Sequence, residues 1–565
     1  MTRYFVAVLL LLLPLGGCRT REKARTATGA APTPTAAAAP KLGYLDESGE
    51  GTPVEGGVLR RRLVGEPATL NAVLQSGLPE QQVLQYVSRQ LLDFDARLEL
   101  TGNLAERWEV SDDGREYRFF LRNDAVWEDG KPVSSADAVF TIHRIVDPRV
   151  PAPVFKPLFG TLETVEPIDG KSFRVRFRDR DALRLYAFAI PLLPEHRFRG
   201  RTFMKAPDNR APLANGPYRV EKWKTQESVE LARNPRWNGP PAHFEKIVLR
   251  IVPENSVAYR ALVEGDLDES WMDQPLKDRS ESDRRFQDCC RVVEFYNLDY
   301  NYIGLNNRSP FFSDARVRRA MTMLLDRPAI VRNLYHGSAR IISGPWAPDS
   351  PAYDSTVTPL PFDPRAAGEL LDQAGWRDTN GNGIRDHAGR EFEFDLLLSA
   401  GSNAGRQIDE IFATELARAG VKARIRSLEW ATFTERIDAG EYEAATLAWA
   451  AADPNPDPLP YWHSSQFPPR GLNSAWYSNP AADRLMEEAH AEMDPEKRSE
   501  IYHRLHRVLR DNPPVVFVVN ASQKYGFRRR VHGLVTSPLG LYGFSPGPLS
   551  WWGSPEAGGP KPSAQ

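Results

Sequence analysis

The stretch from residue 104 to residue 147 reads LAERWEVSDDGREYRFFLRNDAVWEDGKPVSSADAVFTIHRIVD. Within it, residues 116–119 (Glu-Tyr-Arg-Phe) alternate polar and apolar side chains, which predicts a strand with one buried face. Residues 112–114 (Asp-Asp-Gly) predict a turn before that strand. Ser134 or Ser135 precedes an apolar run and predicts the start of a helix. Strand and helix signals therefore follow one another within one short segment.

Upstream of this stretch the same mixture of signals continues. Residues 58–64 predict a short strand, and Gly65 and Pro67 mark a turn after it. Residues 80–92 predict a helix. The whole chain has 565 residues, which is too long for one hydrophobic core and predicts two or three folding units.

The overall composition is that of an ordinary globular protein, with 41% hydrophobic and 26% charged residues. The net charge of −2 and the lack of a long basic run in the sequence give no case for a nucleic-acid partner. The sequence contains no G-x-S-x-G, H-E-x-x-H or C-x-x-C motif. We therefore expect no enzymatic activity, no cofactor and no metal site.

The first residues predict a lipoprotein signal peptide over 1–17. An apolar run at 4–15 is too short to span a bilayer, and the sequence LGGC then ends at Cys18. This motif resembles the bacterial lipoprotein box, in which the cysteine is lipidated and becomes the new N-terminus. An ordinary secretory signal followed by an incidental cysteine is the alternative.

The segment 18–55 is predicted to consist of the lipidated cysteine, Cys18, and a flexible tether rich in Ala, Pro and Thr. The tether is predicted because its residues show no hydrophobic period. No later apolar run reaches 18 residues. We expect a soluble body held at the bacterial cell envelope, on the periplasmic or extracytoplasmic face, by a lipid anchor. Arg19 follows the cysteine, and the choice between inner and outer membrane stays open.

Several motifs in collinear order give the body its resemblance to a known family. The segments 104–147, 215–239 (NGPYRVEKWKTQESVELARNPRWNG), 260–268 (RALVEGDLD) and 302–339 resemble the family 5 extracellular solute-binding proteins. These proteins are peptide, dipeptide and nickel receptors of ATP-binding-cassette (ABC) importers. The resemblance implies a monomer whose partners are a small-molecule or peptide ligand and an ABC permease and ATPase complex.

The resemblance also implies an α/β fold of the two-lobed periplasmic-binding-protein type. Both lobes would have mixed sheets, and a hinge between them would let them close on the ligand. The implied parts are a first lobe at 56–297 with an extra subdomain at about 80–205, a second lobe at 298–512, a return into the first lobe at 513–555, and a disordered tail at 556–565.

The stretch LAWAAADPNPDPLPYW at 447–462 is the main candidate for ligand binding. The resemblance implies that the strand ending at Trp449 and Ala450 offers its backbone to an extended peptide. An aspartate three residues after the tryptophan usually receives the ligand's α-ammonium in this family. That position is alanine here, so Asp453 and Asp457 are the candidates. A stiff exit loop, with aspartates capping backbone N–H groups, is the alternative.

Further ligand contacts are implied by comparison with the oligopeptide receptors of the family. Trp430 lies 19 residues before Trp449, as a tryptophan of the cleft does in those receptors. Ser76, Gly77 and Leu78 resemble the segment of the first lobe whose backbone touches the ligand. Charged groups for ligand termini are few, which keeps open an oligosaccharide, an opine-like solute, a metal chelate, or a sensor that does not transport.

Two further features leave alternatives open. Residues 378–386 (DTNGNGIRD) space their oxygens as in a calcium loop, but Gly389 stands where a bidentate glutamate is needed. We favour a bare surface turn over weak calcium binding. Cys289 and Cys290 are adjacent and cannot staple distant segments, so buried thiols are favoured over a strained vicinal disulfide.

Overall fold

The structure is a computed structural model, and it describes residues 44–450, 454–468 and 471–554. Cys18, Asp453 and the segment 556–565 lie outside these residues, and so do the predicted signal peptide and most of the tether. Throughout the described chain, helices and strands alternate in a mixed α/β order. None of the helices described is both long and apolar enough to cross a membrane.

One mixed sheet has seven strands in the order β12-β22-β11-β1-β10-β9-β8. Strand β1 (Val58–Leu63) is parallel to β10 and β11, and the remaining pairs are antiparallel. Leu59 and Leu63 are fully buried and supply the core face of β1. The other strands are β8 Tyr218–Lys224, β9 Ser228–Arg233, β10 Lys246–Ile251, β11 Glu269–Trp271, β12 Cys290–Phe295 and β22 Gln523–Arg528.

A four-stranded antiparallel sheet, β4-β5-β7-β6, contains the stretch on which the sequence analysis began. The strand predicted at 116–119 is confirmed as β5 (Glu116–Leu121), with Tyr117, Phe119 and Leu121 buried. Helix α2 (Ser135–Val146) packs on this sheet and begins at the N-cap Ser134, whose capping box includes Asp137. The other strands are β4 Ala105–Val110, β6 Leu162–Pro167 and β7 Ser172–Phe177.

Helix α1 (Leu78–Val87) begins earlier and ends earlier than the prediction of 80–92. The chain leaves the helix because the following N–H groups find partners elsewhere. The N–H of Arg89 donates to Asn215 Oδ1 at 2.8 Å, and that of Leu91 donates to the carbonyl of Ile190 at 2.7 Å. Leu92 then starts strand β2 (Leu92–Phe94), which pairs with β3 (Leu100–Gly102).

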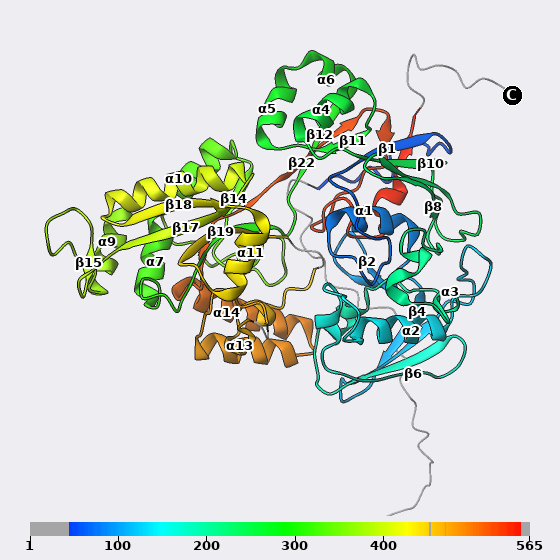
Figure 1. Cartoon of the computed structure of the whole chain (residues 1–565), viewed down its shortest axis with the longest axis horizontal. Coiled ribbons are helices and arrows are strands. Elements are labelled where there is room, and N and C mark those ends of the chain that lie inside the picture. The colour runs from blue at the N-terminus through cyan, green and yellow to red at the C-terminus, as the bar shows by residue number, and fades with distance from the viewer. Residues whose placement is uncertain (1–43, 451–453, 469–470, 555–565) are drawn as a thin grey trace, which may run out of the picture. The chain divides into compact units, whose positions relative to one another are not determined.

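A second mixed sheet has five strands in the order β18-β17-β19-β13-β20. Strand β17 (Glu393–Ser399) is parallel to both neighbours, whereas β13 (Tyr300–Leu305) is antiparallel to both of its own. Helix α10 (Asn403–Arg418) runs along this sheet, as Figure 1 shows. The other strands are β18 Lys422–Leu428, β19 Ala444–Trp449 and β20 Val516–Phe517, and the helices that pack with them include α7 Ala315–Leu324, α9 Pro364–Gln373, α11 Trp430–Ala439, α13 Pro480–Ala491 and α14 Pro495–Asp511.

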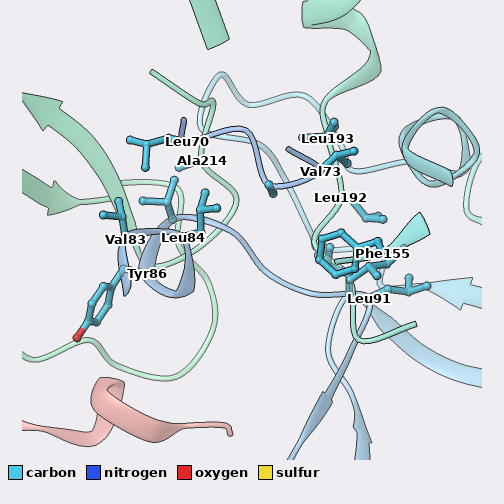
Figure 2. Close-up of a cluster of buried hydrophobic side chains, with 14 of the residues drawn as sticks. Leu70, Val73, Val83, Leu84, Tyr86, Leu91, Phe155, Leu192, Leu193 and Ala214 are labelled. Carbon is cyan, nitrogen blue, oxygen red and sulfur yellow. The ribbon is translucent and has the colours of Figure 1, made fainter. Parts of the chain in front are cut away.

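Among the described residues, the buried hydrophobic side chains fall into clusters, and none of these clusters contains residues of both large sheets. One cluster joins the seven-stranded and four-stranded sheets, and Figure 2 shows part of it, where Val83 and Leu84 of α1 lie beside Leu70 and Ala214. A smaller one lies around helices α4 Asn255–Glu264, α5 Gln274–Ser282 and α6 Arg284–Cys289. The remaining clusters draw their buried residues from 300–519 and surround the five-stranded sheet.

The chain passes between the two large sheets twice. It leaves the seven-stranded sheet at Phe295, the end of β12, and enters the five-stranded sheet at Tyr300. It returns after β21 (Val519–Ala521) and reaches the seven-stranded sheet at Gln523. The family resemblance implied a return into the first lobe at 513–555. Strand β20 still belongs to the five-stranded sheet, so the chain returns later than residue 513.

Candidate ligand-binding site

Strand β19 has one edge that is paired only in part. On one side it pairs with β13 along its whole length, from Leu305↔Ala444 to Tyr300↔Trp449. On the other side its described partner is β17, and the register there covers only Leu396↔Ala444 and Leu397↔Ala445. Residues 446–449, which we call the open segment, therefore have an edge that no described strand covers. An extended ligand can add to such an edge through backbone hydrogen bonds.

The two faces of the open segment differ in chemistry, because side chains alternate along a strand. Leu447 and Trp449 face an aromatic group, in which the Trp449 and Tyr461 rings meet edge-on with centroids 4.2 Å apart. A cavity of about 20 Å³ lies there. Its lining consists of Tyr302, Gly304, Tyr442, Leu447, Trp449, Tyr461, Trp462, Leu472, Ser474 and Ala475.

The opposite face of the open segment carries a buried carboxyl group. Thr446 Oγ1 donates a hydrogen bond to Asp409 Oδ1 from helix α10. Asp409 is 0% exposed, and its Oδ2 has no hydrogen-bond partner in the described chain. Burial raises the pKa of Asp409 to about 7, although the bond from Thr446 and the charge of Arg406 act in the opposite direction. Ala448, further along the same face, is exposed.

The sequence analysis missed Asp409, although a signal for it exists. Ile408, Phe412 and Leu416 recur at helical spacing and predict the buried face of α10. Asp409 lies three residues before Phe412, on that same apolar face. A carboxyl group in this position needs a buried partner, and the sequence does not show which strand supplies it.

The candidate tryptophans occupy different settings. Trp430 is the first residue of α11, is 61% exposed, and stacks on Phe433 with ring centroids 5.9 Å apart. Phe433 packs with Leu397 and Ala445, so α11 covers the face of the sheet opposite to α10. Trp449 is half-buried at the end of β19, and the predicted contact Ala450 follows it and is exposed.

Asp457 is already engaged within the protein. It is buried, its Oδ1 accepts the N–H of Leu459 at 2.9 Å, and its Oδ2 lies 2.8 Å from His490 Nδ1. Burial alone lowers the pKa of His490, but the hydrogen bond to Asp457 and the negative charges of Asp181 and Asp457 raise it overall. This arrangement agrees with the exit-loop alternative for Asp457. Asp453 lies outside the described residues.

The predicted contacts Ser76, Gly77 and Leu78 lie together at the start of α1. Gly77 is the N-cap of this helix and Leu78 is its first residue. Ser76 is exposed, and Leu78 is 51% exposed despite being apolar. A polar and an apolar residue are therefore both exposed at this point of the chain.

The turn at 378–386 and the adjacent cysteines, two other features of the sequence, each have a defined local structure. In the turn at 378–386, Asp378 Oδ1 accepts the N–H groups of Gly381 and Asn382, and its Oδ2 accepts that of Gly383 at 2.9 Å. Cys289 and Cys290 are free thiols whose sulfur atoms lie 2.9 Å apart. Among the described residues, no cluster of three or more His, Cys, Asp or Glu side chains could hold a metal ion.

Comparison with known proteins shows which proteins this chain resembles over most of its length. The oligopeptide-binding protein AppA of Bacillus subtilis (strain 168) is 25% identical over 520 residues, which cover 89% of this chain and 92% of AppA. The structure of AppA in complex with a nonapeptide matches with a TM-score of 0.76 at 24% identity, over 89% of this chain and 100% of that one.

Two further structures share the fold. NikZ from Campylobacter jejuni in complex with Ni(L-His) matches with a TM-score of 0.75 at 23% identity, over 89% of this chain and 100% of that one. DppA from Helicobacter pylori in complex with the peptide STSA matches with a TM-score of 0.73 at 21% identity, over 88% and 98%. These likenesses confirm the predicted two-lobed α/β fold class.

The family model described as bacterial extracellular solute-binding proteins, family 5 Middle, matches residues 99–469. This region is more than half of the chain and includes the four-stranded sheet and the open segment of β19. The protein therefore belongs to the family 5 bacterial extracellular solute-binding proteins, as the collinear motifs predicted.

Proposed function

We propose that this protein is the solute-binding receptor of an ABC importer and that its solute is a peptide. The observation that carries the proposal is the open segment at 446–449, where the edge of β19 is uncovered beside Trp449. An extended peptide adds to such an edge through its main chain, so it can be bound without its sequence being read. The AppA relative, described as oligopeptide-binding, supports this choice of ligand.

The proposed contacts divide between the two large sheets. On the five-stranded sheet, Trp449, Ala450 and Trp430 would line the ligand, and Asp453 would receive its α-ammonium. Beside the seven-stranded sheet, the backbone at Ser76, Gly77 and Leu78 would touch the ligand from the other side. Asp457 would hold the exit loop rather than the ligand, because both of its carboxylate oxygens have partners.

Closure of two lobes around the ligand is part of the same proposal. The first lobe would contain the seven-stranded and four-stranded sheets, and the second the five-stranded sheet. The two chain passages at 296–299 and 522 would act as the hinge, because none of the hydrophobic clusters in the described part of the chain joins the lobes. A ligand held by both lobes would favour the closed arrangement.

We also propose that Cys18 is lipidated and holds the protein at the outer face of a bacterial membrane. The sequence LGGC at 15–18 after an apolar run supports this. Substitution Cys18→Ala should move the protein from the membrane fraction to the soluble fraction. Retention of the variant in the membrane fraction would contradict lipid anchoring through this residue.

The test of the peptide assignment is native mass spectrometry of the full-length protein as purified in mild detergent. A retained mass that fragments as a peptide is the expected result. A retained sugar or metal complex would overturn the peptide assignment and leave the receptor role intact. If the protein is empty, isothermal titration with alanine-based peptides, oligosaccharides and nickel–histidine distinguishes the same ligand classes.

Transport itself is tested separately from ligand class. Deletion of the gene should reduce uptake of the labelled solute, and the wild-type gene should restore it. Normal uptake in the deletion strain would favour the alternative, a sensor that binds the solute and does not deliver it.

A further inference from the structure

The open segment of β19 presents a different chemistry on each of its faces. If the proposed function holds and a peptide adds to this edge, the side chains of successive ligand residues point to opposite faces of the sheet. A ligand residue beside Leu447 or Trp449 points toward the aromatic cavity. A ligand residue beside Thr446 or Ala448 points toward the face covered by α10, where Asp409 lies.

Asp409 is unusual because both oxygens of a buried carboxyl group normally have hydrogen-bond partners. Its Oδ1 accepts the hydroxyl of Thr446, and its Oδ2 has no partner in the described chain although the residue is 0% exposed. Thr446 is the first residue of β19 beyond the pairing with β17. The unsatisfied oxygen therefore belongs to a side chain bonded to the very start of the uncovered edge.

Among the described residues, no cationic side chain forms an ion pair with Asp409. Arg406, one turn earlier on α10, is exposed, and no hydrogen bond or ion pair joins its side chain to Asp409 in the structure. Ala448 is small and exposed on the same face of β19, so solvent reaches this face of the strand two residues beyond Thr446. An ammonium or guanidinium group here would satisfy Oδ2 with a charge-assisted hydrogen bond.

We propose that Asp409 is a specificity-determining residue that receives a cationic side chain, lysine or arginine, of the bound peptide. The ligand residue concerned lies beside Thr446 or Ala448, and the residues next to it along the peptide face the aromatic cavity. The preferred ligand is therefore an extended peptide with a basic residue at this position. This selectivity is additional to the main-chain binding of the proposed function.

The test compares two sets of alanine pentapeptides by isothermal titration with the full-length protein. One set carries a single lysine at successive positions, and the other carries norleucine, which has a similar apolar stem and no charge. At one position, lysine should bind about ten- to a hundredfold more tightly than norleucine. Equal affinities at every position would overturn the inference and leave peptide binding intact.

The variant Asp409→Asn is the matched control, because the amide oxygen can still accept the bond from Thr446. In this variant the preference for lysine should disappear, whereas affinity for the norleucine peptides should stay within about twofold. If both sets weaken equally, Asp409 supports the strand and does not select the ligand. If neither set binds to the wild-type protein, the peptide assignment itself fails.

A second measurement avoids dependence on the folding of the variant. The preference of the wild-type protein for lysine should grow as the pH rises through neutrality, because Asp409 must be ionised to hold the cation. Calorimetry in two buffers of different ionisation enthalpy should show proton release with the lysine peptide and none with its norleucine partner. The charges of Arg406 and Glu410, the charged neighbours of Asp409, are the same in both measurements and so do not distinguish the two peptides. Equal proton release with both would overturn the inference.

Discussion

Arg61 shows how a single buried residue can organise the seven-stranded sheet. Its side chain is fully buried, its Nε donates to Glu269 Oε2 at 3.0 Å, and its Nη1 donates to the hydroxyl of Tyr86 at 2.6 Å. The guanidinium also lies over the ring of Tyr542, 4.2 Å from the centroid. Strands β1 and β11, helix α1 and the C-terminal segment thus meet at one side chain.

Replacing Arg61 with alanine should lower the free energy of unfolding by about 3–5 kcal/mol, because it leaves the buried carboxylate of Glu269 without its counter-charge. Urea denaturation measures the change. The control is Arg60→Ala, whose side chain is 42% exposed and 4.0 Å from Asp268, so its effect should stay within about 1 kcal/mol. A similar loss of unfolding free energy in both variants would contradict the role of Arg61 as the buried counter-charge of Glu269.

His490 makes stability depend on pH in a definite direction. Its pKa is raised in the folded protein, so folding favours the protonated form. The stabilisation is fully present below about pH 6.5, the ordinary value for histidine, and is lost as the pH rises through the raised folded pKa. The variant His490→Gln should lose this component of the pH dependence, as followed by urea denaturation across the range. Identical pH profiles for the two proteins would refute the role of the pair.

At the scale of elements, Gly216 in the motif NGPY lets the segment that leads into strand β8 lie close to the end of helix α1. A Cβ atom on this residue would lie 2.7 Å from the carbonyl oxygen of Tyr86 and 2.8 Å from the carbonyl carbon of Val87. Both are backbone atoms at the end of α1, so neither can relieve the contact by rotating as a side chain can. Helix and strand can approach this closely because the side chain is absent.

The substitution Gly216→Ala should therefore destabilise the protein by about 1–3 kcal/mol through overpacking. The matched control is Gly170→Ala, where an added Cβ would meet nothing within 4 Å. Thermal unfolding of both variants measures the difference. An unchanged melting temperature for Gly216→Ala would show that α1 and β8 can separate without cost.

The turn at 378–386 gives a prediction about metal binding. The carboxylate of Asp378 already accepts three backbone N–H groups, so a calcium ion would have to replace these bonds. Adding about 5 mM calcium, within reach of weak extracellular sites, should leave the melting temperature unchanged relative to excess chelator. A clear rise would favour the alternative, weak calcium binding, which the sequence left open.

For the whole molecule, the separation of the hydrophobic clusters predicts how the protein unfolds. Because no hydrophobic cluster formed by the described residues mixes the two large sheets, the ligand-free protein should show two thermal transitions. A ligand held by both lobes at a hundredfold excess over Kd adds about 2.7 kcal/mol and should bring the transitions together. Differential scanning calorimetry measures this. A shift of one transition alone would place the ligand on a single lobe.

The sequence by itself determined those features that depend on local pattern and on collinear motifs. Alternation at 116–119 predicted β5, and a serine before an apolar run predicted α2 with its cap at Ser134. The motif series predicted the family and the fold class, because many short matches in one order leave little room for another topology. Such signals lie within a few residues of one another, so they can be read along the chain.

Only the tertiary structure decided what happens at the ends of elements and at the candidate site. Helix α1 ends early because Asn215 and Ile190, far away in the sequence, accept the N–H groups that follow it. The open edge of β19 exists because β17 stops pairing with it after Ala445. Asp409 and Thr446 meet across 37 positions of sequence, and Asp457 meets His490 across 33. These contacts depend on how the elements pack in space, which no local pattern encodes.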